Sequence, residues 1–287
     1  MALKIDDDTK HVVCYSGGHS SALVAIEVAR RYGRYSTYLI NHDINPRVEH
    51  PDIKRFKQEV ADYLGIPITY ANHKNWDTMD QFDVCNSIGY ISSPGVGAVC
   101  THNLKVLPFR SWLKNNAKDK NVVIYYGFDK NEKKRIQRRS GILGGQGYQT
   151  DYPLALWKER TIESTKDIGI EPPLTYTVYK HANCLGCLKG GKQHWYVIYC
   201  REPEIWKKAK EMEENIGFTI LRDRSTDQPI YLDELEPAFE KMKKAGVPAS
   251  DNVNGNTFWG ATSRLLTQYE KRLVEDGKDE KPCECFT

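Results

Sequence analysis

The spacing of hydrophobic residues divides the first 150 residues into alternating strands and helices. Short apolar runs rich in β-branched and aromatic residues predict strands at 11–15, 37–40, 66–70 and 121–127. Apolar residues that recur at helical spacing predict helices at 22–32, 51–64 and 107–116. Strands that alternate with helices are typical of a parallel sheet covered on both faces. We therefore expect an α/β domain over residues 1–150.

The second half of the chain has a different pattern, in which helical spacing dominates and prolines interrupt the connecting segments. We expect helices at 204–216, 232–245 and 258–275. Residues 151–287 should therefore form a smaller, mostly helical C-terminal part, with a charged tail from about residue 276. The sequence contains no low-complexity linker between the two parts, so the expected boundary is gradual.

Composition narrows the class of protein. The chain has 287 residues, with 41 Lys and Arg against 38 Asp and Glu and a formal net charge of +3. Such a balance does not require a nucleic-acid partner, although it leaves room for a local basic patch. No apolar run approaches the roughly 18 residues of a membrane-spanning helix, and the N-terminus has no basic-then-apolar leader. We therefore expect a cytoplasmic protein without a membrane partner.

The most informative segment is Ser16-Gly-Gly-His-Ser-Ser21, which lies between the first predicted strand and the first predicted helix. A helix N-terminus presents backbone N–H groups and the positive end of the helix dipole, and two glycines let the backbone curl around an anion. The loop therefore favours a phosphate or pyrophosphate site. It has neither the Walker A spacing nor the GxGxxG spacing. An ordinary strand-to-helix turn with a serine cap is the alternative interpretation.

This loop resembles the SGGxDS pyrophosphate loop of the PP-loop ATP pyrophosphatases, and more closely the phosphoadenosine phosphosulfate (PAPS) reductase family within them. Four further segments resemble that family's motifs in the same order. They are 41–50 (DTGxEH), 100–108 (Cys-x-x-(Arg/Leu)-Lys-x-x-Pro), 126–135 (GxRxxES-x-R) and 152–157 (Pro-Leu-x-x-Trp). The resemblance spans about residues 10–200. It implies a Rossmann-like adenine nucleotide α-hydrolase (HUP) fold.

The resemblance also implies where a nucleotide would bind. The pyrophosphate would lie on the loop, Asp43 would meet the nucleotide or a metal ion such as Mg²⁺, and basic side chains would neutralise the phosphates. Catalysis would rest mainly on positioning and charge stabilisation. The implied residues are Ser16, Gly17, Gly18, Ser20 and Ser21 on the loop, and Lys105, Arg135 and Arg138 among the basic side chains. A solvated basic helix face is the alternative interpretation of residues 133–139.

The chain departs from the family pattern at several positions. Ser20 replaces the Asp of the loop, which removes a carboxylate that could help hold magnesium, and Phe128 replaces the Arg of GxR. The tail reads Cys283-Glu-Cys285-Phe-Thr, whereas sulfonucleotide reductases of this family end in Glu-Cys-Gly-x-His. The Glu-Cys pair is present, but the Gly and the His are not. Reductase activity therefore does not transfer directly to this chain.

Eight cysteines in a chain without an export signal favour metal ligands, redox thiols or buried side chains over disulfides. Cys184 and Cys187 form a CxxC turn that could hold one metal ion or one face of a cluster. Cys100 occupies the position where cluster-bearing reductases of the family carry a Cys-Cys pair. With Cys283 as the fourth ligand, these residues would hold a four-iron four-sulfur cluster, with zinc as the alternative. Cys285 is either a further ligand or a redox thiol.

These observations leave three functions open. We favour an adenine-nucleotide-binding PP-loop enzyme of sulfur metabolism, which cleaves ATP between the α- and β-phosphates to adenylate a substrate and couples this to sulfur transfer. The alternatives are a PAPS or adenylyl-sulfate reductase that uses a tail cysteine, and a non-catalytic nucleotide-binding module of a larger complex. The expected partners are an adenine nucleotide and a nucleic acid or sulfur carrier. A homodimer is a candidate assembly.

Overall fold

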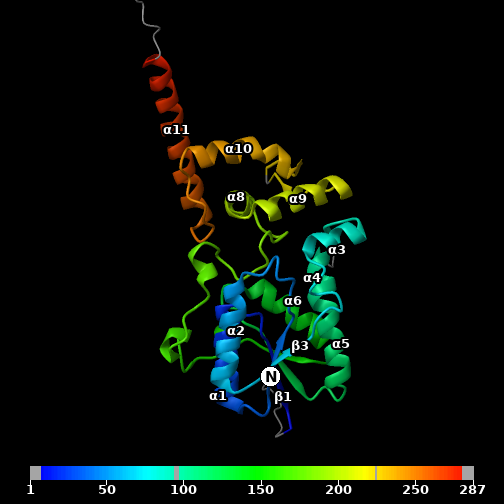
Figure 1. The fold of residues 1–287 in the computed structure, drawn as a ribbon. Helices are drawn as coiled ribbons and strands as arrows, with labels where there is room; N and C mark the ends of the chain where they lie inside the picture. The colour runs from blue at the N-terminus through cyan, green and yellow to red at the C-terminus, as the bar shows by residue number, and fades with distance from the viewer. Residues whose placement is uncertain (1–7, 94–96, 224, 280–287) are drawn as a thin grey trace, which may run out of the picture. The chain divides into compact units, whose positions relative to one another are not determined.

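The structure is a computed structural model that describes residues 8–93, 97–223 and 225–279, and its chain divides into two compact units (Figure 1). The first unit comprises the chain up to Tyr176 together with His181–Cys184. The second comprises Thr177–Lys180 and the chain from Leu185 onward. Residue 150, where the sequence pattern placed the end of the α/β domain, lies inside strand β7 (Gln149–Asp151) of the first unit.

The first unit is built around a five-stranded sheet in which every strand pair is parallel. Its strand order is β3-β2-β1-β6-β7. The register places Val13 of β1 opposite Leu39 of β2 and opposite Tyr125 of β6. The strand bounds are β1 (Lys10–Cys14), β2 (Thr37–Asn41), β3 (Ile68–Tyr70), β6 (Val122–Tyr125) and β7 (Gln149–Asp151).

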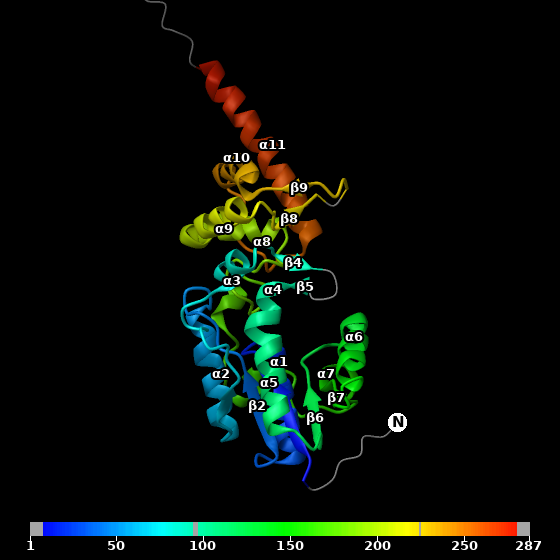
Figure 2. The ribbon, with the colours of Figure 1, turned by 90° about the vertical axis from the view of Figure 1, so that its right-hand side faces the viewer.

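Helices cover both faces of the sheet, because successive residues of a buried strand point to opposite faces. Val13 belongs to a core cluster with Phe56 of α2, whereas Val12 belongs to a cluster on the other face with Leu113 of α5. Figures 1 and 2 show α1 and α2 on one side of the sheet and α5 on the other. The helix bounds are α1 (His19–Tyr32), α2 (Pro51–Leu64), α5 (Leu107–Asn116), α6 (Lys133–Gly144) and α7 (Pro153–Leu156).

The α/β class is confirmed, and the parallel sheet is Rossmann-like. The predicted strands correspond to β1, β2, β3 and β6, and the predicted helices of this unit to α1, α2 and α5. β3 begins only after Pro67, because proline has no N–H to give to the strand ladder. Its other elements are α3 (Gln81–Ile88), β4 (Ser92–Ser93), β5 (Gly97–Ala98), α4 (Val99–Thr101) and the π-helical turn η1 (His102–Val106). Two 3-10 turns follow α7, at Thr165–Ile168 and Leu174–Thr177.

The second unit is mostly helical, as the sequence predicts, and contains one short hairpin in its described part. Its aromatic residues form a core, in which Trp206 lies 6.3 Å from Trp195 and 5.7 Å from Phe239 between ring centroids. None of the helices in the described ranges is long and apolar enough to cross a lipid bilayer. The elements are α8 (Lys192–Arg201), α9 (Pro203–Ile216), β8 (Leu221–Arg222), β9 (Pro229–Ile230), α10 (Leu232–Lys244) and α11 (Gly255–Asp279).

Candidate functional site

The strand order places a topological switch point between β1 and β6. From β1 the sheet continues through β2 to β3 on one side, whereas β6 and β7 extend it on the other. In open parallel sheets, ligands bind outside the carboxyl ends of the strands at such a point. Two turns follow the strands there, at 15–18 between β1 and α1 and at 126–132 between β6 and α6. The candidate site is built from these two turns and the end of β2.

The turn after β1 has a shape that requires glycine. Gly17 has a φ of 80°, in the left-handed region that glycine favours. A Cβ atom built there would come 2.9 Å from Cγ2 of Ile53, so the turn lies directly against helix α2. The Ser21 hydroxyl closes the turn, since it accepts from the Ser16 N–H at 3.2 Å and donates to the Gly18 carbonyl at 2.8 Å. These contacts fix the backbone of the turn before any ligand binds.

The same turn presents backbone donors at the N-terminus of α1. Gly18 is the N-cap residue, and no side chain caps the helix. The N–H groups of Gly17 and Gly18 have no hydrogen-bond partner among the described residues. The N–H of His19 donates to the Tyr176 hydroxyl at 3.0 Å. An anion on this turn would therefore meet two unpaired N–H groups and the positive end of the helix dipole.

A buried cluster of charges lies at the carboxyl end of β2. The Lys57 side chain is 2% exposed, and its Nζ lies 3.0 Å from Oδ1 of Asp43 and 3.6 Å from Oε1 of Glu49. Lys54 has a side chain that is 37% exposed and lies 3.7 Å from the same Asp43 oxygen. A buried charge is costly unless it is paired, so Lys57 and the two carboxylates depend on one another. The predicted site residue Asp43 is thus held by two lysines.

Lys105 contributes to this edge of the sheet from the π-helical turn η1, a feature often found at functional sites. Burial, with a smaller contribution from the charge of Lys105, lowers the pKa of His42 to about 4. Burial raises the pKa of Glu49, while the nearby lysines, Lys105 among them, oppose the shift. Oε2 of Glu49 is buried without a hydrogen-bond partner in the described structure. Lys105 therefore lies within electrostatic reach of the buried cluster.

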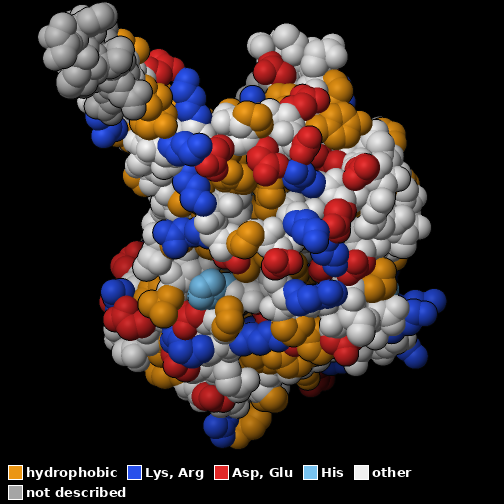
Figure 3. All heavy atoms as spheres, turned by 45° about the horizontal axis from the view of Figure 1, so that its top comes forward, with side chains coloured by type: hydrophobic (Ala, Val, Ile, Leu, Met, Phe, Trp, Pro, Cys, Tyr) orange, Lys and Arg blue, Asp and Glu red, His pale blue; other side chains and the backbone are white. Residues whose placement is uncertain are grey.

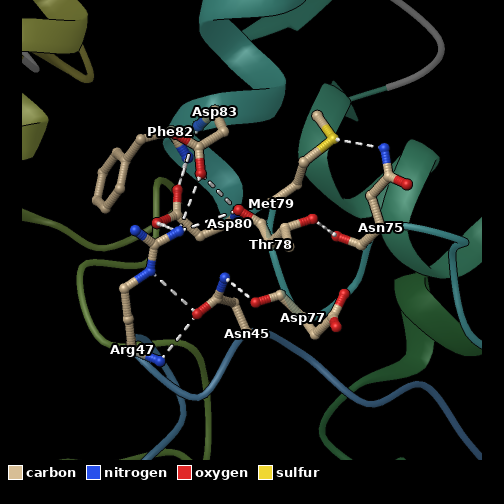
Figure 4. Close-up of polar contacts among 9 residues, drawn as sticks. All are labelled: Asn45, Arg47, Asn75, Asp77, Thr78, Met79, Asp80, Phe82 and Asp83. Atoms are coloured by element: carbon tan, nitrogen blue, oxygen red, sulfur yellow. Dashed lines mark hydrogen bonds and ion pairs between the residues drawn. The ribbon is translucent and has the colours of Figure 1, made fainter.

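A polar network holds the loop between β2 and α2 against the segment that precedes α3 (Figure 4). The Asn45 side-chain amide donates to the Asp77 carbonyl at 2.9 Å, and its oxygen accepts from the Arg47 N–H at 3.0 Å. The Arg47 guanidinium lies 3.8 Å from Asp80 and 3.5 Å from Asp83. These two aspartates also form the capping box of α3. The loop that carries the buried carboxylates is thereby fixed to the start of α3.

Gly127 brings the turn after β6 against the turn after β1. A Cβ atom at Gly127 would come 3.0 Å from the Ser20 carbonyl carbon and 3.0 Å from the Ser21 nitrogen. Such contacts are with backbone atoms, which cannot rotate away, so a larger residue would push the two turns apart. Glycine at this position therefore allows both turns to face one ligand.

Aromatic rings lie on both sides of Gly127 in the sequence, and an arginine lies over one of them. The rings of Tyr126 and Phe128 stack with centroids 5.4 Å apart, and Tyr152 stacks 6.0 Å from Phe128. The Arg135 guanidinium lies 4.3 Å from the centroid of the Phe128 ring and forms an ion pair with Glu132. The predicted site residue Arg135 is thus engaged locally on α6, at the border of the second turn.

The structure brings most of the predicted nucleotide-site residues to one edge of the sheet. They follow the carboxyl ends of the central strands or lie within electrostatic reach of them. This group comprises Ser16, Gly17, Gly18, Ser20, Ser21, Asp43 and Lys105. Arg135 and Arg138 lie on α6, beyond the second turn.

The chain is similar to a phage protein. It is 26% identical over 248 residues to the uncharacterized nin region protein ORF290 of Escherichia phage lambda. The alignment covers 76% of this chain and 78% of the relative. No family model and no solved structure matches the chain. The relative's name states no activity.

The predicted cysteine centre is not assembled within the described residues. Cys100 lies in α4 and Cys184 also belongs to the first unit, whereas Cys187 belongs to the second. No group of three or more His, Cys, Asp or Glu side chains in the described ranges is placed to hold a metal ion. Cys283 and Cys285 lie outside the described residues. The four-cysteine site therefore stays a prediction.

His194, which the sequence analysis missed, has the setting of a metal-ligand histidine. Its Nδ1 lies 2.8 Å from Oδ2 of Asp251, and its Nε2 is buried with no hydrogen-bond partner in the described structure. Metal-bound histidines commonly donate their other ring N–H to a carboxylate. The sequence signal is the spacing C-x₂-C-x₆-H, which ends at His194.

Lys57 is a second residue that the sequence analysis missed. It lies on the apolar stripe of α2, where Ile53, Phe56 and Val60 are also buried. A lysine on the buried stripe of an amphipathic helix is a usable signal, because its charge must find a partner inside the protein. The partners could not be named from the sequence, since they come from the loop after β2.

Proposed function

We propose that the chain is an adenine-nucleotide-binding enzyme of the PP-loop type, with the adenine nucleotide α-hydrolase variant of the Rossmann-like fold. The observation that carries the proposal is the turn after β1. It combines a left-handed Gly17 packed on α2 with unpaired N–H groups at a helix N-terminus, at the switch point of a parallel sheet. Phosphate is the ligand class that suits such a turn. ATP and sulfonucleotides both carry phosphate next to an adenosine.

The reaction we favour is cleavage of ATP between its α- and β-phosphates. An oxygen of the acceptor would attack the α-phosphorus, the bond to the bridging oxygen would break, and pyrophosphate would leave with the electron pair. Gly17 and Gly18 would donate N–H groups to the pyrophosphate, while Lys105 would neutralise its charge. A sulfur nucleophile would then displace AMP from the adenylated acceptor.

The carboxylates of the site fit a magnesium ion that arrives with the nucleotide. Mg²⁺ is usually held by one or two carboxylates together with substrate phosphates and waters. Among the described residues Oε2 of Glu49 has no hydrogen-bond partner and lies 3.6 Å from Nζ of Lys54, and Asp43 lies beside the same lysines. These two residues would hold the ion, which would supply further neutralisation of the phosphates.

The described residues do not include a complete site for the sulfur donor. Cys100, Cys184, Cys187 and Cys283 are its proposed ligands. Iron, zinc and sulfide analysis of protein purified anaerobically tests this directly. Cys184→Ser should remove the bound metal, whereas Cys85→Ser should not, because Cys85 is not one of the four proposed ligands.

Calorimetry with ATP, GTP and PAPS, followed by assays of released pyrophosphate and sulfite, tests the proposed function. Binding of ATP in preference to GTP, with pyrophosphate release, is the expected result. Sulfite release from PAPS with a thiol reductant would favour the reductase alternative. Binding of ATP without release of pyrophosphate or sulfite would favour the non-catalytic module, for which the replacement of the loop Asp by Ser20 is the supporting observation. No binding of any of the three nucleotides would overturn the proposal.

A further inference from the structure

Helix α6 carries more positive charge than the net charge of the whole chain. Its sequence is KKRIQRRSGILG, with five cations among the first seven residues and no carboxylate. The helix alone carries a formal charge of +5, whereas the whole chain carries +3, so the rest of the chain is slightly acidic. Over the face drawn in Figure 3, by contrast, basic and acidic side chains are interspersed. The charge on α6 is therefore a local feature.

The positions of the cations in α6 are unfavourable for the stability of the helix. Lys133, Lys134 and Arg135 occupy the first turn, where the positive end of the helix dipole disfavours cations, and the turn has no acidic residue. Lys133, Lys134, Arg135 and Arg138 are exposed. In the described part of the chain no carboxylate forms an ion pair with Lys133 or Lys134. A merely solvated surface helix gains nothing from this arrangement, whereas a surface that binds a polyanion does.

Aromatic side chains in the turn that precedes α6 indicate which class of polyanion would bind. The Arg135 guanidinium lies 4.3 Å from the centroid of the Phe128 ring, and the Arg139 guanidinium lies 5.3 Å from that of Tyr126. Both rings are partly exposed. Unpaired bases stack on aromatic rings and on guanidinium planes, and basic grooves with such rings are typical of single-strand binding. The carboxylates of an acidic protein segment would not stack on these rings and guanidinium planes.

We propose that the exposed face of α6, together with Tyr126 and Phe128, binds single-stranded nucleic acid. Lys134 and Arg138, which are four residues apart on one side of the helix, contact phosphates. Arg135 and Phe128 provide the stacking plane for a base. The surface begins at the turn that Gly127 holds against Ser20 and Ser21. That the bound strand is the acceptor adenylated at the site rests on the proposed function; binding of the strand does not.

Fluorescence anisotropy with labelled 20-nucleotide DNA and RNA strands, and with a duplex of the same sequence, tests the surface in the absence of ATP. The double variant Lys134→Glu/Arg138→Glu should bind the strands at least tenfold more weakly. Its salt dependence should also be shallower by about 1.4 in log–log slope, since each lost phosphate contact in a single strand contributes about 0.7. The full-length chain is used throughout, and melting curves check that each variant is folded.

The matched control is Arg110→Glu/Lys114→Glu on α5, which makes the same charge change at the same spacing on exposed positions of the same unit. It should bind the strands within twofold of the wild type. Phe128→Leu should weaken strand binding severalfold with an unchanged salt slope, because it removes stacking and no charge. Equal losses in the two double variants would overturn the proposal. So would tighter binding of the duplex, or equal competition by polyglutamate. A wild-type protein that binds the strands as expected but does not bind ATP would count only against the proposed function.

Discussion

Two strand-to-helix turns meet at the switch point of the sheet, and they differ in the chemical groups that they present. The turn after β1 consists of serine and glycine, and it leads into α1, in which Ser21 to Val28 are all buried. The turn after β6 leads into α6, where Leu143 is the buried residue and five of the first seven residues are cations. One turn presents backbone N–H groups and the other presents side-chain charge and rings.

The difference teaches how two kinds of anion can be recognised at one sheet edge. Backbone donors on a buried helix are fixed in place and can match the size of one phosphate group. Exposed cations on long side chains are adaptable and can follow a phosphate backbone of variable shape. We therefore expect substitutions in the first turn to act on nucleotide binding, and substitutions in the second to act on binding of a nucleic-acid strand.

The largest effect is expected at Gly17. Gly17→Val places a branched side chain at a φ of 80° and into contact with Ile53, which moves the backbone away from the ligand. ATP affinity should fall at least about 1000-fold, which corresponds to about 4 kcal/mol. Calorimetry measures the loss, and strand binding should stay within twofold of the wild type.

Gly89→Val is the matched control for Gly17→Val. Gly89 has a φ of 84° and no heavy atom within 4 Å of a built Cβ, so it carries the same backbone strain without the collision. The control variant should be somewhat less stable but should bind ATP as the wild type does. Normal ATP binding by a folded Gly17→Val protein would remove the basis for the phosphate site.

The second effect concerns the stability of the buried charge cluster at the end of β2. Lys57→Met leaves Asp43 and Glu49 without their buried cation, and breaking a buried pair commonly costs 3–5 kcal/mol. We expect a loss of about 3 kcal/mol in the free energy of unfolding, at the low end because Glu49 can take up a proton. Denaturant unfolding measures the loss. Lys54→Met, which removes a more exposed lysine from the same carboxylates, should cost less than about 1 kcal/mol.

The third effect is a difference between two single substitutions, one beside each turn, in ATP binding and strand binding. Lys105→Ala should weaken ATP binding about tenfold, because Lys105 lies within electrostatic reach of the cluster beside the first turn. Arg135→Ala should change ATP affinity less than about twofold but weaken strand binding, because its guanidinium is engaged on Phe128 at the second turn. Calorimetry and anisotropy give the two readings. The reverse pattern would assign Arg135 to the nucleotide, as the family resemblance implies.

The sequence predicts those parts of the fold that carry their own periodic signal. Residues 11–15 and 51–64 have clear strand and helix patterns, and they form β1 and α2. β7 (Gln149–Asp151) has no apolar run, and it becomes a strand only through pairing with β6. A single-sequence pattern contains no information about such a partner.

The candidate site likewise has features that could be predicted from the sequence and features that could not. The glycine loop could be located because glycine and serine before a helix have a local meaning. The pairing of Lys57 with Asp43 and Glu49 could not, because it joins a helix to a loop through the tertiary structure. The contact of Gly127 with the first turn is likewise a product of the strand order.

The smallest effect is a pH dependence at the end of β2. The Nδ1–H of His42 donates to the Ala71 carbonyl at 2.5 Å, and burial lowers the pKa of His42 to about 4. The unfolded chain takes up this proton near pH 6.5 and the folded chain does not, so stability falls as the pH drops from 6.5 toward 4. Between pH 7 and pH 5.5 the loss should be about 1 kcal/mol for this group. Burial also lowers the pKa of His11 to about 4 and lowers that of His19, which adds to the loss, whereas burial raises the pKa of Glu213 to about 7, which opposes it.

His42→Gln isolates the contribution of the site histidine, because a glutamine amide can still donate to the Ala71 carbonyl but does not titrate. The other titrating groups are the same in the variant and the wild type, so the two proteins should differ only by the contribution of His42. Between pH 7 and pH 5.5 the variant should therefore lose about 1 kcal/mol less unfolding free energy than the wild type. Urea unfolding at the two pH values measures both changes. A variant with the same change as the wild type would show that His42 is hydrated in the folded protein. The end of β2 would then be open to water, and the contrast between a fixed, desolvated first turn and an adaptable, solvated second turn would lose one of its supports.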